Sequence, residues 1–357
     1  MKLKKIFAGA FAALMCAASL TACSGGTSDT STSSDDSSSG YSSAGSNSAP
    51  ENSTDNSSTP ETSKPEKVRI VALKGPTAMG MTKMMNDRET TGDTSFEFEI
   101  LAAPDEITPK VAQGTVDIAC VPANLGAVLF NKTEGKVQAM AVNTLGVLYI
   151  CENGDTVKSI DDLKGKTIYS AGKGSTPEYA LNFVIKSSGL ENDVNIEWKS
   201  EHAECLTALL ANENSVAMLP QPFVTTAQTK NEGVRVALDL NDEWDKLGVD
   251  SSLLTGIVIV RKEFADEYPD TVKDFLKEYG DSVKYVNENV DAAAELVGKY
   301  DIVPAAVAKK AIPNCHIVCV TGSGMKDMLS GYLKVLFDNE PKSVGGTLPT
   351  DAFYFVG

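Results

Sequence analysis

Short runs of alternating apolar and polar residues, separated by stretches with helical periodicity, organise the chain from about residue 68 onward. Val68–Leu73 alternates and is rich in β-branched residues, which predicts a strand that ends at Lys74-Gly75-Pro76-Thr77. Further runs of the same kind alternate with helical patterns, and this order predicts a layered α/β unit with a largely parallel sheet. These strands are expected over 96–101, 116–121 and 137–150, and the helices over 78–87, 105–113 and up to Asn131.

The pattern then begins again and predicts a second α/β unit. A strand over 167–170 leads into the Gly-rich turn Ala171–Gly174. Ser175-Thr176-Pro177-Glu178 follows with capping-box spacing and a proline in its first turn, so we expect a helix from there to Ser188. The remaining expected elements are strands over 195–198, 215–219, 253–260 and 315–320, and helices over 203–211, 264–288, 292–300, 305–311 and 325–337.

The second unit is inserted into the first, because the strand and helices that follow it are needed to complete the first unit's core. We therefore expect an α/β fold of two lobes, each a mixed, mostly parallel sheet flanked by helices. One lobe would comprise 67–144 with 253–357, and the other 145–252. Two crossings, near 143–150 and 253–258, would form the hinge between them.

The first 22 residues have the features of an export signal. Three lysines occur among the first five residues, and Ile6–Leu20 is an apolar run of about 15 residues, shorter than a membrane-spanning helix. Leu20-Thr21-Ala22-Cys23 resembles the lipobox of bacterial lipoproteins, in which the cysteine becomes the lipidated first residue. We expect 1–22 to be a signal peptide and Cys23 the site of lipid attachment. The alternative is an ordinary secretory signal with an incidental cysteine.

Residues 23–66 are expected to be a disordered tether, because 22 of the 43 residues from Cys23 to Pro65 are Ser or Thr. Random-coil scaling gives this tether a reach of about 36 Å and a stretched limit on the order of 145 Å. A long tether favours a single-membrane, Gram-positive-type cell. The protein is then expected outside the cytoplasm, on the outer face of the cell membrane, which it contacts only through its lipid anchor.

Composition excludes several classes of protein. With 42% hydrophobic and 22% charged residues, the chain is neither collagen-like nor wholly disordered nor a polytopic membrane protein. The net charge is −16 and the basic residues are scattered, which argues against nucleic acid as a partner. The part after the tether keeps 28 basic and 42 acidic residues, so the acidity belongs to the folded lobes. We expect this part to be a monomer.

Residues suited to catalysis are scarce. The two histidines, His202 and His316, lie in no recognisable nucleophile, zinc or nucleotide motif. Cys315 and Cys319 would be about 13 Å apart in a strand, too far to share one metal ion. We expect these cysteines, with Cys120, Cys151 and Cys205, to be core residues, and we expect no enzyme activity, no cofactor and no metal.

Four loops predict a binding site instead, because ligands of open α/β sheets lie beyond the carboxyl ends of strands, where helices begin. Two loops come from each unit, and each combines backbone-exposing or rigid residues with a short polar side chain. The predicted ligand-binding residues are Lys74, Gly75, Pro76, Thr77, Ala123, Asn124, Ser175, Thr176, Pro220 and Gln221. The alternative for each loop is an ordinary turn with a helix cap.

The charge of these loops restricts the ligand. Lys74 is their one cation, none of them contains Arg, and Glu178 lies in the first turn of a predicted helix. A phosphate-like ligand would favour Arg or Lys at this place. We therefore expect a small organic ligand that is neutral, cationic or weakly anionic. The alternative is that such acids only complement helix dipoles.

Four segments resemble the solute-binding lipoproteins of ABC importers, in the branch that takes nitrate, sulfonates, bicarbonate and thiamine precursors. They are Val71–Met81, Leu163–Ile168, Gly172–Tyr179 and Met218–Pro222, and the resemblance extends over about 68–357. It implies a type II periplasmic-binding-protein fold whose lobes close by a hinge over a solute, of sulfonate or pyrimidine class, and deliver it to an ABC permease.

Two other functions stay open on the same fold. Some relatives are pyrimidine-forming enzymes with pyridoxal phosphate and a cysteine-rich iron motif, from which this chain departs because its cysteines are dispersed. The third hypothesis is a sensory or adhesive surface lipoprotein that does not take part in transport.

Overall fold

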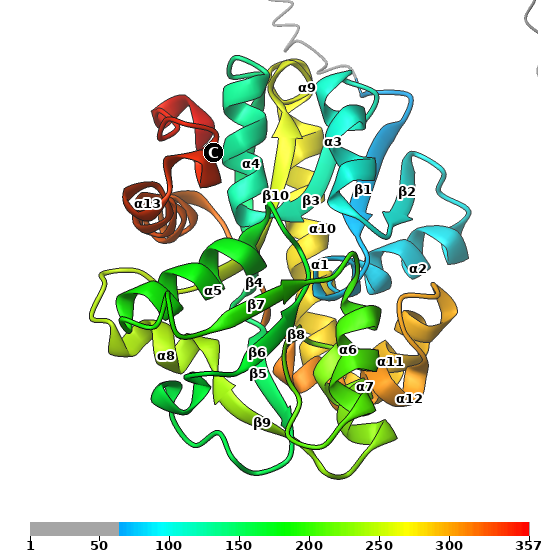
Figure 1. Ribbon diagram of the computed structural model, residues 1–357. Helices are drawn as coiled ribbons and strands as arrows, with labels where there is room; N and C mark the ends of the chain where they lie inside the picture. The colour runs from blue at the N-terminus through cyan, green and yellow to red at the C-terminus, as the bar shows by residue number, and fades with distance from the viewer. Residues whose placement is uncertain (1–63, 357) are drawn as a thin grey trace, which may run out of the picture. The chain divides into compact units, whose positions relative to one another are not determined.

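Two mixed β-sheets flanked by helices form the fold, as the hydrophobic pattern predicts (Figure 1). A computed structural model describes residues 64–356, and all of these fall within one compact unit of the chain, Thr59–Gly357. The predicted signal peptide 1–22, lipid-attachment residue Cys23 and nearly all of the tether lie outside the described residues.

The first sheet has the strand order β11-β4-β10-β3-β1-β2. β1 pairs in parallel with β2 and β3, and the helices between these strands cover the sheet. Most residues of the central strands β1, β3 and β10 are buried, as expected for strands that helices cover on both faces. Its strands are β1 (Val68–Leu73), β2 (Phe96–Leu101), β3 (Ile118–Pro122), β4 (Val137–Leu145), β10 (Leu254–Arg261) and β11 (Ile317–Val320).

Helices around the first sheet differ from expectation at two places. The predicted helix over 78–87 is interrupted at Gly80, where a Cβ atom would lie 2.9 Å from the Tyr279 hydroxyl. The predicted helix over 264–288 is interrupted because Pro269 starts a new helix. These helices are α1 (Pro76–Met79), α2 (Thr82–Thr91), α3 (Pro104–Ala112), α4 (Ala123–Lys132), α9 (Lys262–Glu267), α10 (Pro269–Glu288), α11 (Val290–Lys299), α12 (Ala305–Ala311) and α13 (Gly322–Asn339), with the 3₁₀ turns η2 (Ile312–Asn314), η3 (Pro341–Val344) and η4 (Asp351–Phe353).

The second sheet has the strand order β7-β6-β8-β5-β9, and its strands lie in sequence between β4 and β10. Two α-helices and one strand of this unit were not expected from the sequence: α7 (Phe223–Lys230), α8 (Leu240–Lys246) and β9 (Val234–Asp239). No helix among residues 64–356 is long and apolar enough to cross a membrane. The elements are β5 (Leu148–Asn153), η1 (Ile160–Leu163), β6 (Thr167–Ser170), α5 (Thr176–Ser187), β7 (Asn195–Trp198), α6 (His202–Ala211), β8 (Val216–Pro220), α7 (Phe223–Lys230), β9 (Val234–Asp239) and α8 (Leu240–Lys246).

Both sheets are mixed and most of their strands run in one direction, as expected from the sequence; the reversed strands are β10 and β11 in the first sheet and β5 in the second. β10 runs antiparallel to both β3 and β4, β11 to β4, and β5 to both β8 and β9. The antiparallel direction of β5 and β10 has a topological reason. β5 is the first strand after the chain enters the second sheet, and β10 is the first strand after it returns to the first sheet. At this passage Leu145 pairs with Leu254. We keep the lobe boundaries, 67–144 with 253–357 and 145–252, as a proposal.

An apolar cluster joins the two sheets on one side of the molecule. Trp244 of α8 is fully buried, with its ring centroid 4.6 Å from that of Phe183 in α5 and 5.7 Å from that of Tyr332 in α13. Because α13 covers the first sheet while α5 and α8 cover the second, this cluster fixes the relative position of the two lobes along that side.

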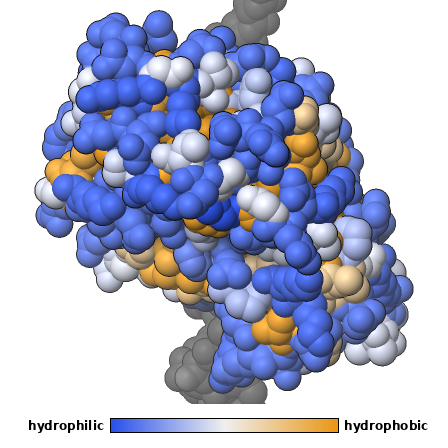
Figure 2. All heavy atoms as spheres, turned by 60° about the horizontal axis from the view of Figure 1, so that its bottom comes forward, coloured by the Kyte–Doolittle hydropathy of each residue, from blue (hydrophilic) through white to orange (hydrophobic). Residues whose placement is uncertain are grey.

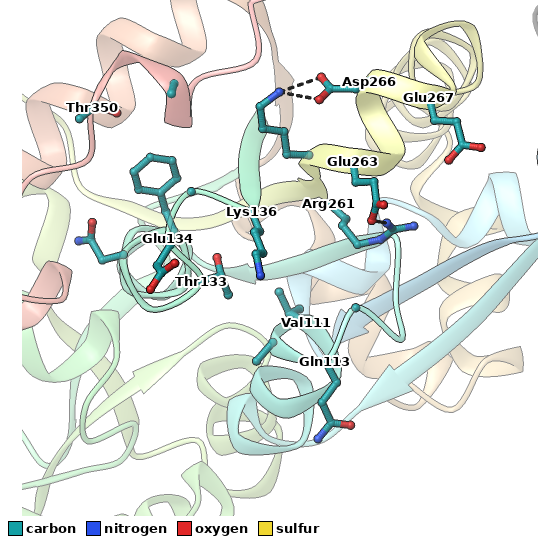
Figure 3. Close-up of a pocket in the computed structure, with 17 residues that line it drawn as sticks. Val111, Gln113, Thr133, Glu134, Lys136, Arg261, Glu263, Asp266, Glu267 and Thr350 are labelled. Atoms are coloured by element: carbon teal, nitrogen blue, oxygen red, sulfur yellow. Dashed lines mark hydrogen bonds and ion pairs between the residues drawn. The ribbon is translucent and has the colours of Figure 1, made fainter. Parts of the chain in front are cut away.

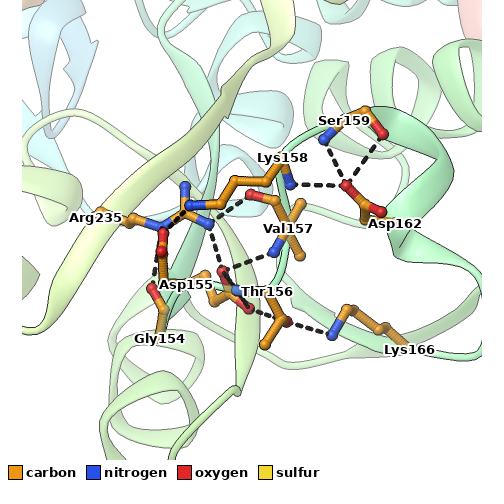
Figure 4. A network of polar contacts seen from close by, with 10 residues as sticks. Gly154, Asp155, Thr156, Val157, Lys158, Ser159, Asp162, Lys166 and Arg235 are labelled. Atoms are coloured by element: carbon orange, nitrogen blue, oxygen red, sulfur yellow. Dashed lines mark hydrogen bonds and ion pairs between the residues drawn. The ribbon is translucent and has the colours of Figure 1, made fainter.

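A buried carboxylate holds the outer loop of the second sheet (Figure 4). Glu152 of β5 is fully buried and accepts hydrogen bonds from the backbone of Thr156 and Val157 and, at 2.6 Å, from Arg235. Burial by itself would raise the pKa of Glu152, but these hydrogen bonds and the charge of Arg235 outweigh it and lower that pKa.

Glu152→Gln should lower the free energy of unfolding by about 2 kcal/mol at neutral pH, because it removes a charged acceptor from buried donors. The lowered pKa means that this stabilisation is present above the unfolded pKa of about 4.5 and is lost as the pH falls through the folded value. Urea unfolding at pH 7 and pH 3.5 measures both effects. Glu263→Gln, at an exposed ion pair with Arg261, is the control; an equal loss in both variants would contradict the assignment.

Candidate functional site

The four predicted loops lie at the facing edges of the two sheets. β1 and β3 are parallel to each other and end at one edge of the first sheet, and β6 and β8 do the same in the second. Helices α1, α4, α5 and α7 begin directly after these strands. The predicted residues are therefore gathered between the lobes, and most are buried; Lys74 is the exposed member of the set.

Asn124 and Thr176 meet across the two lobes. The Thr176 hydroxyl donates to Asn124 Oδ1 at 3.2 Å, and Asn124 Nδ2 donates to the carbonyl of Ser343 at 3.0 Å. Asn124, Thr176 and Ser343 are each fully buried. The amino-terminal ends of α4 and α5 thus contact each other, and the two lobes are closed against each other at this point.

The other predicted side chains have partners within their own loops. Thr77 Oγ1 donates to the carbonyl of Leu73 at 2.5 Å, and Ser175 Oγ donates to the carbonyl of Gly172 at 2.7 Å. Gln221 Oε1 accepts from the amide and the hydroxyl of Thr225, at 3.3 and 2.9 Å. Within residues 64–356 the Nε2 atom of the Gln221 side-chain amide donates no hydrogen bond. This N–H donor is therefore available to an acceptor on a solute.

A polar group that the sequence analysis missed lies beside Thr77. Asn143 of β4 is fully buried, its Oδ1 accepts from Thr144 at 3.2 Å, and its Nδ2 has no partner among the described residues. A Cβ atom on Gly256 of β10 would lie 2.5 Å from Asn143 Oδ1 and 2.7 Å from Thr77 Cγ2. The signal in the sequence was the pair Asn143-Thr144 inside an apolar run.

Lys74 contributes little net charge to this region. Its ammonium group lies 3.6 Å from a carboxylate oxygen of Asp301, and both side chains are substantially exposed. Such exposed pairs are weak because water screens them, and the same screening weakens the effect of Lys74 on the buried residues of the loops. The other predicted site residues are uncharged, as the sequence indicates.

His202 is a second residue that sequence reasoning set aside. It begins α6, and its ring centroid lies 5.5 Å from that of Phe223, the first residue of α7. Its Nδ1 atom is buried and has no hydrogen-bond partner among the described residues. Burial lowers the pKa of His202 from 6.5 to about 4, so the ring is neutral at physiological pH.

A cavity of about 1120 Å³ among the described residues lies elsewhere (Figure 3). It opens between the carboxyl ends of α3 and α4 and the start of α9, at the end of the first sheet opposite the predicted loops. None of the ten predicted residues lines it. Two of its three cations, Arg261 and Lys262, are paired with Glu263 and Asp266, and the third is Lys136. Since α/β sheets bind ligands at the carboxyl ends of their parallel strands, the loops and not this cavity remain the proposed solute site.

The cysteines are spread through the core. All five in the described part of the chain are free, and Cys319 is the one that is not fully buried. Burial raises the pKa of Cys120, Cys151 and Cys315 to about 12, so these groups are thiols and not nucleophilic thiolates. No cluster of His, Cys, Asp or Glu within 64–356 is arranged to hold a metal ion.

Figure 2 shows the molecule turned so that the lower end in Figure 1, where the second sheet lies, comes toward the reader. Hydrophilic residues dominate it, and apolar residues form small separate groups. Within residues 64–356 the exposed large apolar side chains are Val236, Leu348 and Val356, which lie in different parts of the chain. Single exposed apolar residues of this kind are common on the surfaces of folded proteins.

Comparison with protein-family models decides the family. Residues 79–308, more than half of the chain, match the model described as the periplasmic substrate-binding protein of phosphonate ABC transporters. The chain belongs to this family of ABC-transporter substrate-binding proteins. A comparison with curated protein sequences finds no match.

Solved structures of substrate-binding proteins share the fold. An ABC transporter protein from Parabacteroides distasonis has a TM-score of 0.68 at 22% identity, covering 82% of this chain and 99% of its own. The aliphatic sulphonate binding protein SsuA of Escherichia coli has a TM-score of 0.64 at 15% identity, covering 79% and 96%. SsuA from Xanthomonas axonopodis pv. citri, bound to MOPS, has a TM-score of 0.62 at 15% identity, covering 81% and 96%. The periplasmic-binding-protein fold expected from the sequence is therefore confirmed.

His202→Gln should make this substrate-binding protein less sensitive to acid. The folded-state pKa of about 4 lies below the ordinary 6.5, so wild-type stability is complete above pH 6.5 and falls as the pH drops toward 4. Between pH 7 and pH 4.5 the wild type should lose about 2 kcal/mol more than the variant. Urea unfolding at the two pH values measures this difference, and an imidazole that titrates near 6.5 by NMR would contradict it.

Proposed function

We propose that this protein captures a small organic solute between its two lobes and delivers it to an ABC permease. The observation that carries the proposal is the buried Asn124–Thr176 contact, which brings loops of the two sheets together where a solute would be enclosed. Membership of the substrate-binding family supports the same reading. Catalysis is not part of the proposal, because the buried cysteines are thiols and His202 faces no nucleophile that the sequence analysis identifies. The pyrimidine-forming enzyme and the sensory or adhesive lipoprotein remain the alternatives.

The solute is proposed to be a weakly anionic organic molecule of the sulfonate class. A doubly charged phosphonate would favour an arginine clamp, and the four loops contain no arginine. A monoanion can be held by backbone amides at helix starts together with neutral donors, such as the amino group of Gln221. The sulfonate-binding neighbours support this class, and a pyrimidine is the neutral alternative.

Solute binding should raise the melting temperature of the full chain. A ligand at 100 times its dissociation constant adds about 2.7 kcal/mol to the free energy of unfolding. Differential scanning fluorimetry with alkanesulfonates, alkylphosphonates, pyrimidines and amines identifies the class. A sulfonate that stabilises the chain more than the matching phosphonate is the expected result, and turnover of a bound compound would favour the enzyme alternative.

Gln221→Glu provides the matched test of the site. It keeps the oxygen that accepts from Thr225 and replaces the free amino group with an oxygen, so binding of an anion should weaken at least tenfold. Gln113→Glu makes the same chemical change at the distal cavity and should leave binding unaltered. The opposite outcome, with Gln113→Glu impaired and Gln221→Glu intact, would move the site to that cavity.

Lipid anchoring is proposed at Cys23, with the protein on the outer face of the membrane. Metabolic labelling with radioactive palmitate should be lost in Cys23→Ala, because this thiol carries the lipid in the lipobox pattern. Cys16→Ala, which removes a thiol from the expected signal peptide, is the control and should remain labelled. Label that persists in Cys23→Ala would show that the anchor is elsewhere.

A further inference from the structure

The short segment that carries the chain between the two sheets is held from both lobes. Leu145, the last residue of β4, donates its amide to the carbonyl of His316 at 3.2 Å. Val147, just before β5, accepts the amide of Gln221 at 3.1 Å. The residue between them, Gly146, is therefore fixed on one side to the segment before β11 and on the other to a predicted solute loop.

The Gly146 carbonyl accepts two side-chain hydrogen bonds, one from each lobe. His316 Nδ1 lies 2.6 Å from this oxygen, and Asn241 Nδ2 lies 3.2 Å from it. Because a carbonyl oxygen can only accept, the Nδ1 atom of His316 carries the proton. His316 precedes β11 of the first sheet, whereas Asn241 belongs to α8 beside the second sheet.

The backbone at Gly146 and at His316 allows these residues to approach each other closely. A Cβ atom on Gly146 would lie 1.6 Å from Asn241 Oδ1, so only glycine allows the amide to reach the carbonyl. His316 has φ 43, in the left-handed region where His, Asn and Asp are among the residues that are tolerated. Asn241 is itself oriented by Asp239, whose carboxylate accepts from its amide and its side chain, both at 2.8 Å.

We propose that the Gly146 carbonyl is a shared clasp that holds the lobes closed before solute arrives, with His316 and Asn241 as positioning residues. If the inserted lobe rotates away, Gly146 can follow Asn241 or stay with His316, but the other hydrogen bond has to break. The clasp thereby sets the fraction of closed protein, and with it the apparent affinity for a solute that neither side chain needs to touch. This role rests on the proposed function, in which lobe closure captures the solute.

The test measures lobe opening directly and uses no solute, so it is independent of the solute's identity. Spin labels on Thr90→Cys and Thr207→Cys, exposed residues of α2 and α6, report the distance between lobes in the full chain (Figure 1). The unsubstituted chain treated with the same label corrects for the native cysteines. Double electron–electron resonance then gives the populations of short and long distances between the two labels.

His316→Asn and His316→Asp form the matched pair. Both residues tolerate a positive φ, and both place an atom where Nδ1 lies, but only the asparagine can donate to the Gly146 carbonyl. His316→Asn should resemble the wild type, while His316→Asp should raise the ratio of open to closed protein about fivefold or more, as expected for one lost hydrogen bond. Equal distance distributions for the two variants would overturn the clasp.

Gly146→Ala gives a second, steric test that does not depend on His316. Its Cβ atom collides with Asn241, so the variant should shift the labels to longer distances. Gly146→Ala combined with Asn241→Ala removes the collision and should open no further than Asn241→Ala alone. A Gly146→Ala chain as closed as the wild type would also overturn the proposal, whether or not a solute has been found.

Discussion

The antiparallel pairing of β4 with β10 is the constraint on which the rest of the structure depends. These strands belong to the first sheet, yet they flank the whole inserted unit in sequence, and Leu145 and Leu254 pair at the point of departure and return. Because the two segments that connect the sheets are paired with each other at Leu145 and Leu254, the second sheet can rotate relative to the first only about this pair. On the side of α5, α8 and α13, the aromatic contacts of Trp244 restrict that movement further.

This constraint explains why the loops meet as they do. With one side packed and the crossings fixed, closure brings the starts of α4 and α5 together, and Asn124 and Thr176 satisfy each other. The same side chains that a solute could use are thus paired in its absence. A buried donor or acceptor without a partner costs more than a hydrogen bond gains, so this pairing makes the unoccupied closed arrangement attainable.

Much of the fold could be predicted from local sequence. The strands over 96–101, 167–170 and 195–198 and the helix over 305–311 have the expected bounds. Apolar and polar residues alternate in the first and the last of these strands, and Pro304 precedes the helix. The helix at Phe223–Lys230 was missed because its Thr- and Gln-rich sequence has little apolar periodicity. The strand at Val234–Asp239 does alternate, and that signal was overlooked.

The site could be predicted only as a set of loops. Strand ends and helix starts indicate where a ligand can lie, and the loop residues do gather between the sheets. The pairing of Asn124 with Thr176, 52 positions apart, depends on how the two sheets pack, which no local pattern encodes. Asn143 was missed for a related reason, since the unpartnered state of its Nδ2 appears only when β4, β10 and α1 are assembled.

The approach of two helix starts also bears on the charge of the solute. The amino-terminal ends of α4 and α5 each carry a partial positive charge, about half a unit, and Glu178 in the first turn of α5 offsets part of it. The two ends contact each other through neutral side chains. A cation placed between them would add to their repulsion, whereas a monoanion would relieve it. A dianion would be compensated only in part, because Lys74 is exposed and already near Asp301. The geometry therefore moves the expected solute from the broad range of neutral, cationic or weakly anionic molecules toward a single negative charge.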